Sequence, residues 1–498
     1  MTELKERRYL IRRPQALQYF YRGELKKLQE KERVAGRFEL FLDLLCMYVP
    51  IVSAVSLSVS KGLKLKVDIN LLQFIVDVAI IANFSDSLAE DATPQNLVKF
   101  ILIFAPAWHA WADAKENANN YYNDDVLQRV GVLWVMALLV VYGNNANLVT
   151  EDIGAIRLTV ATYMVLRFSQ ICLYALYSIA SHHHRTQNRA YFLAILVGLC
   201  IWIPLLFESI SLRTKIAVAV VGIVYEEFCY VLTFGPWLAR WLKLDYSTAV
   251  DIDHENDRYT AFTILVLGEF TYAILVGSPA AGALTLKTLR AVETLIIAFC
   301  FNSMYVYCDG ATESVHPIRR AVWSSFSWLL IHLPLSAGLM LGGHISAATV
   351  PEERLNSGQR WLWGGGLGLG TFCLFLIALL YKDDDPKGFL RFSKPVRLFP
   401  RLLVSITFVL LPLTSEEQLD ATHLVSVGAG LMVLVVAWET VGSLEKDACL
   451  FESWNLTRDD ADSSEDGEEV EILRGETTAT REGESDARPG LDRHYGTY

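Results

Sequence analysis

The chain has 498 residues, 52% hydrophobic and 20% charged, with a formal net charge of −11 at pH 7. Its mean hydropathy is positive, at +0.30, and uncharged apolar runs such as 195–207 and 369–381 recur along it. Because a hydrocarbon core about 30 Å thick needs roughly 20 such residues in a helix, the composition predicts an all-α, polytopic transmembrane bundle. It excludes an ordinary set of soluble domains.

The charge is distributed unevenly along the chain. Residues 1–37 are basic, and we predict a cytoplasmic amphipathic lead with a surface helix over 14–32. Residues 445–498 are acidic and predict a disordered cytoplasmic tail. The lead adjoins a span, so we expect anionic lipid head groups as its partner. No nucleic-acid recognition motif follows it, and nucleic acid is not predicted as a partner.

Taken in chain order, the apolar runs predict about twelve spans, the first at 38–60 or 78–89. The others are 97–118, 126–147, 155–180, 190–209, 214–239, 258–277, 287–308, 320–343, 361–381, 397–413 and 423–443. They divide into two membrane halves of six helices, 38–240 and 241–444. A weak similarity between the halves indicates parallel repeats, as in one large class of transporters.

The loops between the predicted spans alternate in charge. One set is basic, as around Arg185, Arg240 and Arg319, and the other is often acidic, as around Glu90 and Glu151. The positive-inside rule places the basic loops in the cytoplasm, and with them both termini. A plasma membrane and a vacuolar membrane fit equally well, and the pattern does not predict an oligomeric state.

Residues 46–77 conflict with this topology. If 39–60 and 68–86 both crossed the membrane, the later basic loops would face outward. The codons for Cys46 and the following residues can contain a splice-donor sequence, and those for Val76 and Asp77 an acceptor. The favoured interpretation is a retained-intron insert whose removal joins Leu45 and a tyrosine to Val78. The alternative is a genuine insertion that forms a re-entrant or interfacial hairpin.

Ionisable residues inside spans are costly, so they usually face a bundle interior and mark a site. The candidates, with the aromatic residues beside them, are Glu39 and Asp43; Trp108, His109, Trp111, Asp113, Asp124, Asp125 and Arg129; His254, Asp257, Arg258 and Glu269; and Arg167, Glu226, Glu227, Asp309, His332 and Glu439. Glu269 lies about 16 Å along its helix from Arg258 at 1.5 Å per residue. It suits a proton or cation relay, or a buried clamp with Arg129 or Arg167. Gly268 before it predicts a close helix approach.

Three other patterns have alternative interpretations. The glycine-rich run 363–370 lies inside a span, which favours close helix packing over a nucleotide loop. The histidines at 182–184 favour a solvated loop over a metal site. Trp108 and Trp111 belong either to a site or to an interfacial aromatic belt. Without a Walker, H-E-x-x-H or zinc motif in the sequence, neither a cofactor nor a metal is predicted.

Several of these residues together resemble one family. They are Glu39-Leu-Phe-Leu-Asp43, the helix of Trp108 and Trp111 leading to Asp124, Asp125 and Arg129, and His254-x-x-Asp257-Arg258 followed by Leu267-Gly268-Glu269. Over most of 36–440 the chain resembles the low-temperature-requirement A (LtrA-like) membrane proteins, with Asp257 and Thr260 where that family usually has Glu and Gly. The basic lead and acidic tail fit a fungal member. The resemblance implies a polytopic membrane protein linked by name to growth in the cold, and no established activity.

Three functions are compatible with these patterns. The favoured one is a proton- or cation-linked transporter or permease in which Glu269, Glu39 and Asp43 form the relay. Counter-ions or anchors for an anionic substrate would be Arg258, Arg129 and Arg167. The alternatives are an enzyme acting on a lipid-type substrate, with a metal at Asp124 and Asp125, and a scaffold whose tail recruits partners. Transport is favoured over catalysis, and the substrate and coupling ion are not predicted.

Overall fold

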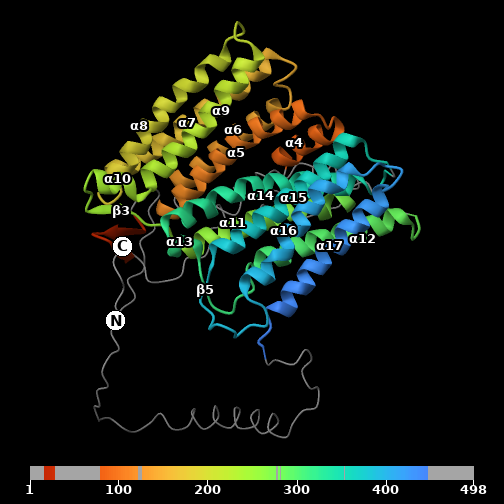
Figure 1. Ribbon diagram of the computed structural model, residues 1–498. Helices are drawn as coiled ribbons and strands as arrows, with labels where there is room; N and C mark the ends of the chain where they lie inside the picture. Colours follow the sequence, from red (N-terminus) through yellow and green to blue (C-terminus); the bar gives the residue numbers. More distant parts are fainter. Residues whose placement is uncertain are drawn as a thin grey trace, which may run out of the picture. The chain divides into compact units, whose positions relative to one another are not determined.

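The computed structural model describes residues 16–27, 79–121, 126–275, 279–280, 282–352 and 354–446. The chain divides after Ser443 into two units, and the first unit is a bundle of helices (Figure 1). Several features predicted from the sequence lie outside the described residues. They are the insert at 46–77, the tail beyond 446, and the side chains of Glu39, Asp43, Asp124 and Asp125.

The N-terminal segment forms a hairpin. β1 (Gln18–Tyr21) pairs antiparallel with β2 (Glu24–Lys27), and its other edge pairs with β3 (Tyr246–Thr248). The surface helix predicted over 14–32 is therefore wrong at these residues. Arg22 and Gly23 have φ values of 48° and 89°, and two successive positive φ values are typical of the tight turn that joins hairpin strands. Pairing with β3, far away in the sequence, completes a three-stranded sheet.

The first half of the bundle contains helices close to the predicted spans. Their bounds are α4 (Ala79–Glu90), α5 (Pro94–Tyr121), α6 (Val126–Ala146), α7 (Ile153–Ala180), α8 (Arg185–Trp202) with the 3-10 turn η1 (Ile203–Leu206), α9 (Leu212–Phe234) and the short α10 (Pro236–Trp241). Polar caps fix two of the starts, because Asp152 accepts from the Gly154 N–H and Ser211 from the Thr214 N–H. The boundaries agree with the prediction to within a few residues, apart from the start of α8 and the end of α9, each of which lies five residues earlier than predicted.

The second half of the bundle also contains one long helix for each predicted span. Its elements are α11 (Ile252–Leu275), α12 (Leu286–Val306), β4 (Ser314–Val315), α13 (Pro317–Arg320), α14 (Val322–Ala348), α15 (Ser357–Leu380), β5 (Lys382–Asp383), α16 (Lys394–Leu410), η2 (Leu411–Leu413) and α17 (Ala421–Gly442). β4 and β5 form an antiparallel pair. Asn356 and Gln359 make a capping box at the start of α15, which satisfies backbone N–H groups that a helix start leaves unpaired.

The long helices of the two membrane halves predicted from the sequence have similar sets of neighbours. In the first, α6 to α9 pack in series, α4 contacts α5 and α6, and α5 contacts α7 and α9. In the second, α14 to α17 pack in series, α11 contacts α12 and α14, and α12 contacts α15 and α17. The halves meet where α5 contacts α11 and α14, and where α4 contacts α14.

Glycines allow α14 and α15 to cross closely. A Cβ added at Gly366 would lie 2.6 Å from the Gly342 backbone nitrogen, and one at Gly338 would lie 2.9 Å from the Gly366 carbonyl oxygen. This confirms the close packing predicted for 363–370. Gly268 on α11 differs, because a Cβ there would meet no atom of the described residues within 4 Å. No helix of the described part of the chain makes the close approach predicted at Gly268, whereas Gly343 on α14 accommodates the ring of Phe270.

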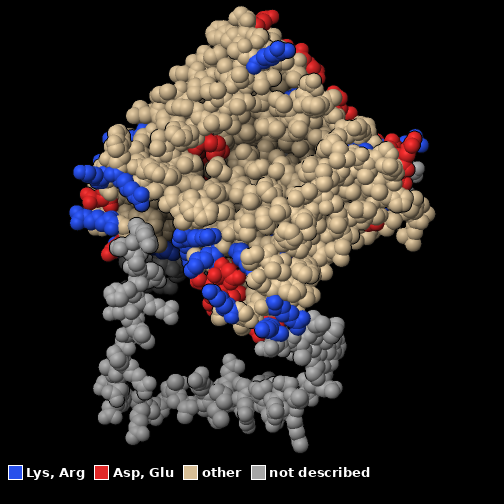
Figure 2. Space-filling view, in the orientation of Figure 1, with Lys and Arg blue, Asp and Glu red and all other residues tan. Residues whose placement is uncertain are grey.

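Within the described residues, nine helices are long and apolar enough to cross a membrane: α6, α7, α8 with η1, α9, α12, α14, α15, α16 with η2, and α17. α5 and α11 have 28 and 24 residues but carry several charged side chains. Figure 2 shows a face that is mostly uncharged, with Lys and Arg side chains gathered near its edges and one acidic group inside the uncharged area. These surfaces suit contact with lipid.

Candidate functional site: a buried acid–base network

Helix α5 carries the polar side chains around which the site is built. Its first half is largely apolar, whereas nearly every residue from 103 to 121 is buried, including Asp113, Lys115 and Glu116, each at most 4% exposed. Buried charges are stable only when paired or well hydrogen-bonded. The surrounding helices α7, α8, α9 and α11 supply those partners.

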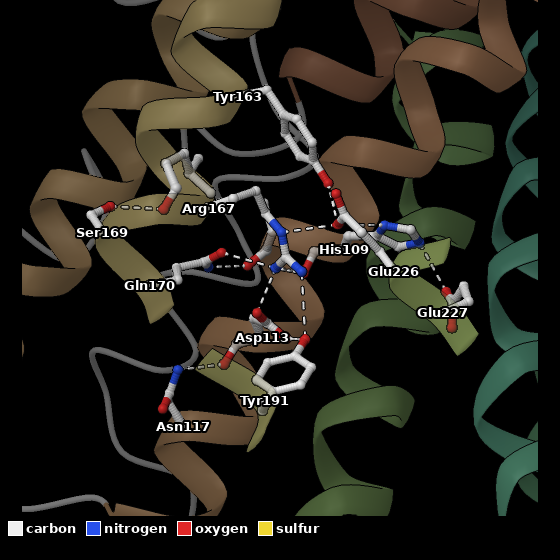
Figure 3. Close-up of polar contacts among 12 residues, drawn as sticks. His109, Asp113, Asn117, Tyr163, Arg167, Ser169, Gln170, Tyr191, Glu226 and Glu227 are labelled. Atoms are coloured by element: carbon white, nitrogen blue, oxygen red, sulfur yellow. Dashed lines mark hydrogen bonds and ion pairs between the residues drawn. The ribbon is translucent and has the colours of Figure 1, made fainter. Parts of the chain in front are cut away.

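Arg167 on α7 is the central cation of the network (Figure 3). It is 1% exposed and lies between two carboxylates. Its Nη1 donates to Asp113 Oδ2 at 2.5 Å, and its Nε lies 3.0 Å from Glu226 Oε2. Tyr191 on α8 donates its hydroxyl to Asp113 Oδ1 at 2.8 Å. One guanidinium thus joins α5, α7 and α9, a geometry that the rigid fork of arginine favours.

His109 extends the network to a partly exposed acid. Its Nδ1 lies 3.3 Å from Glu226 Oε2 and its Nε2 lies 2.9 Å from Glu227 Oε1, as Figure 3 shows. An imidazole can donate from both nitrogens only when it is protonated, so this arrangement fits an imidazolium between two carboxylates. The Glu226 side chain is 2% exposed and that of Glu227 27% exposed. Tyr163 also donates to Glu226, at 2.7 Å.

A second charged group lies further along α5. The Lys115 ammonium forms an ion pair with Glu255 of α11, and it lies 4.2 Å from the centroid of the Tyr259 ring, within the range of a cation–π contact. Asn119 donates to the other oxygen of Glu255 at 3.1 Å. The neighbouring Glu116 accepts from Asn120 at 2.9 Å. The bonds of Lys115 and Asn119 to Glu255 attach α5 to the first turn of α11, whereas the bond between Asn120 and Glu116 lies within α5.

The two groups border a cavity of about 50 Å³, which is room for a few water molecules or a small ligand. It is lined by Trp108, His109, Ala112, Asp113, Lys115, Arg167, Tyr191, Glu226, Glu227, Tyr230, Tyr259, Leu329 and Leu330. These side chains come from α5, α7, α8, α9, α11 and α14. A small space with aromatic and apolar walls and several charged groups has the composition of a site for a small polar molecule or ion.

The structure brings some of the predicted residues together. Trp108 and Trp111 are 6% and 1% exposed and pack against Phe262 of α11, so the alternative of an interfacial belt is wrong for both. Arg167 and Trp108 line the cavity. His332 of α14 is fully buried and lies 4.3 Å from the Tyr259 ring, centroid to centroid, behind the cavity wall.

Other predicted residues lie elsewhere. On α11, His254 and Arg258 are buried, whereas Asp257 is exposed. Arg129 on α6 is also exposed. Glu269 belongs to α11, but its side chain lies outside the described residues, so a clamp with Arg129 or Arg167 stays a prediction.

Two members of the fourth candidate set form ion pairs that do not border the cavity. Asp309 pairs with Lys394 at 2.9 Å. Glu439 on α17 pairs with Arg401 on α16 at 2.6 Å. Arg401 also donates to the Cys308 carbonyl oxygen at 2.7 Å, near the end of α12. These pairs hold helix ends together. Among the described residues, no group of three or more His, Cys, Asp or Glu side chains is arranged to hold a metal ion.

Four residues of the network and its cavity were not predicted from the sequence, namely Lys115, Glu116, Tyr230 and Glu255. The signal for the first two was present as a run of charged and amide residues, 113–120, at the end of a long apolar helix. Glu255 lies two residues before Asp257, in the first turn of α11. One face of that turn is buried and the other exposed, and only the packing of α5 shows which carboxylate points inward.

The end of α5 also anchors the N-terminal hairpin. His184, which follows α7, is fully buried, so the solvated loop predicted for 182–184 is wrong at this residue. Its Nε2 lies 3.1 Å from the Gln18 carbonyl oxygen and its Nδ1 lies 2.7 Å from the Tyr121 hydroxyl. Burial, reinforced by the neighbouring His183, lowers the pKa of His184 to about 4. The hairpin therefore packs on a neutral imidazole.

The free energy of unfolding is expected to fall as the pH is lowered from the unfolded-state pKa of His184 towards its folded-state pKa. The unfolded-state pKa is near 6.5 and the folded-state pKa is about 4, so the unfolded chain binds the proton more tightly. The contribution of neutral His184 to the free energy of unfolding is complete above pH 6.5. Up to about 3 kcal/mol of it is lost as the pH falls towards 4. Thermal unfolding across this range should show a smaller pH dependence in His184→Gln. His182→Gln, at an exposed neighbour, should behave like the wild type, and identical pH profiles for His184→Gln and wild type would contradict the assignment.

The nine apolar helices, together with long helices whose charges are buried in the bundle, define an integral, multi-pass membrane protein. Residues 75–438 match the model of the family described as Bacterial low temperature requirement A protein (LtrA), and the chain belongs to this family. The resemblance found in the sequence is thereby confirmed at the level of the family. No curated protein and no solved structure matches the chain.

Proposed function

We propose that this protein is a proton- or cation-linked secondary transporter or permease whose site is the cavity beside α5. The observation that supports this most directly is the acid–base network around that cavity. Side chains from α5, α7, α8 and α9 line this cavity together with Tyr259 of α11 and Leu329 of α14. In secondary transporters built from repeats, sites lie at the interface between the halves, near the middle of the membrane.

The neighbour pattern of the helices supports two repeats of six. α4 to α9 match α11, α12 and α14 to α17 in the order and in the contacts of each helix. Adding α4, α5 and α11 to the nine apolar helices gives the proposed twelve spans, although α4 alone, at 12 residues, is too short to cross. Its span would include residues before Ala79. Both termini are then cytoplasmic, and the basic lead contacts anionic lipids.

Among the described residues that form the network, acidic groups outnumber the groups that can be cationic. Five carboxyl groups belong to the network, namely Asp113, Glu116, Glu226, Glu227 and Glu255. Three groups can be cationic, namely Lys115, Arg167 and His109. Uncompensated carboxylates are costly inside a membrane, so the site would take up protons or cations. A carrier that links its cycle to such an ion needs this property.

The residues predicted from the sequence take the following roles in this proposal. Arg167 is the counter-ion that holds the network, and Trp108 forms a wall of the cavity. Arg258 and His332 support the helices α11 and α14 around the site. Glu39, Asp43 and Glu269 stay proposed relay residues, and Arg129, Asp124 and Asp125 are proposed at the membrane surface.

Proton flux in proteoliposomes tests the proposal. We expect wild-type vesicles with an imposed pH gradient to acidify faster than empty vesicles in the presence of a transported ion or solute, and we expect Glu227→Gln to reduce that flux at least tenfold. The matched control is Glu208→Gln, whose side chain is 76% exposed outside the helices. Glu269→Gln examines the predicted relay in the same assay. A wild type that shows no flux above empty vesicles across a panel of ions and small solutes would sink the proposal.

A further inference from the structure

Glu116 differs from the other carboxylates of the network in its partners. It is 3% exposed. Its Oε1 accepts from Asn120 Nδ2 at 2.9 Å, and its Oε2 lies 3.5 Å from the Tyr230 hydroxyl. Within the part of the chain that the structure describes, it forms no ion pair with Lys, Arg or His. The carboxylates of Asp113, Glu226, Glu227 and Glu255 each have a cation at ion-pair distance.

Among the residues that the structure describes, the surroundings of Glu116 supply no spare cation. The adjacent Lys115 directs its ammonium to Glu255, so one positive charge serves two buried carboxyl groups. Among the described residues, the titratable groups that interact electrostatically with Glu116 are Asp113, Lys115 and Tyr121 from α5, Tyr174 from α7, Tyr230 from α9, and Glu255 and Tyr259 from α11. Leaving a buried carboxylate without a cation costs several kcal/mol. A bound proton removes that cost.

A proton fits this place better than a metal ion. Hard cations take about six oxygen ligands, whereas Asn120 presents an N–H and Tyr230 a hydroxyl to the two carboxyl oxygens. The Lys115 ammonium nearby would also repel a second cation. We infer that Glu116 is a proton-binding carboxyl of this site, and that Tyr230 connects it to the cavity.

Tyr230 provides the connection because it lines the cavity and also reaches Glu116. Its 3.5 Å separation from Oε2 exceeds the usual 2.7–2.8 Å of an O–H···O bond. Release of the proton breaks the Glu116 O–H bond and transfers the proton to water in the cavity. The carboxylate that forms can then accept a shorter bond from the Tyr230 hydroxyl. Use of this proton to drive transport rests on the proposed function, whereas its binding does not.

Infrared spectroscopy of the full-length protein in lipid vesicles tests this inference. A protonated carboxylic acid has its own carbonyl stretching band, which a carboxylate lacks. We expect such a band at neutral pH in the wild type and in Glu151→Gln, a control at an exposed loop acid, and its loss in Glu116→Gln. Should Glu116→Gln fail to fold, Tyr230→Phe is expected to keep the band and shift its frequency.

Three results would overturn the inference. They are an unchanged band in folded Glu116→Gln, a band that Tyr230→Phe leaves at the wild-type frequency, and a band that disappears at constant pH when Na⁺ is added. In the flux assay, Glu116→Gln is expected to reduce the proton flux at least tenfold. If the wild type showed the band that depends on Glu116 but no proton flux, proton binding by Glu116 would be established. Only the transporter proposal would then be overturned.

Discussion

Replacing Arg167 with methionine is expected to lower the free energy of unfolding by about 3–5 kcal/mol, the usual cost of removing one partner from a buried ion pair. The substitution would leave Asp113 and Glu226 buried without their shared cation, since both lie within 3.0 Å of the guanidinium. Thermal unfolding of the detergent-solubilised protein, followed by size-exclusion chromatography, measures the effect. Arg167→Lys should recover little, because an ammonium cannot reproduce the rigid fork that contacts both acids.

Arg157 offers a matched control on the same helix. Its side chain is 49% exposed, and its Nη2 lies 3.8 Å from a carboxylate oxygen of the exposed Glu208. Exposed pairs of this kind contribute roughly 0–1 kcal/mol, so Arg157→Met should unfold within a few degrees of the wild type. If Arg167→Met were as stable as Arg157→Met, the network would not be a determinant of folding, and its role would have to be sought in function alone.

Replacing Gly366 with leucine is expected to prevent α14 and α15 from packing. The new Cβ would lie 2.6 Å from the Gly342 nitrogen and 2.8 Å from the Gly338 carbonyl oxygen. Because these are backbone atoms, no rotation of a side chain can relieve the clash, and the helices must separate. We expect a loss of at least about 3 kcal/mol, the upper end of the range for overpacked cores. Monodisperse yield and thermal unfolding in detergent would show it.

The adjacent Gly365 is the control for that substitution. Among the described residues, a Cβ at Gly365 would meet nothing within 4 Å, so Gly365→Leu adds the same side chain to the same turn of α15 without a clash with them. It should fold like the wild type. Equal yields for Gly365→Leu and Gly366→Leu would mean that the crossing tolerates separation, and that its glycines do not determine the packing.

The positions of the spans could be predicted because hydropathy is a local property. A run of about 20 apolar residues must cross a membrane as a helix wherever its neighbours lie. The predicted span 126–147, for example, differs from α6 by one residue at its end. The segment 14–32 shows the limit of such reasoning, since β1 exists through its pairing with β3, and Tyr19 lies opposite Thr248.

From the sequence, the residues of the site could be predicted only one by one, without the partner of each. Arg129 and Arg167 are of the same type and both belong to helices of the first half, yet the first is exposed and the second is 1% exposed. Lys115 and Glu255 are separated by 140 positions, and no spacing rule relates them. Their pairing depends on how α5 packs against α11.

The sequence by itself determined the class of protein, the family and the approximate bounds of the helices, because apolar length and family motifs are read along one stretch of chain at a time. Only the tertiary structure decided which charged residues share a site. A charge buried in a membrane protein is stable only beside its partner, and for Asp113 that partner is Arg167, 54 positions away. The packing of α5, α7 and α9 brings the two together, and with them the cavity that we propose as the site.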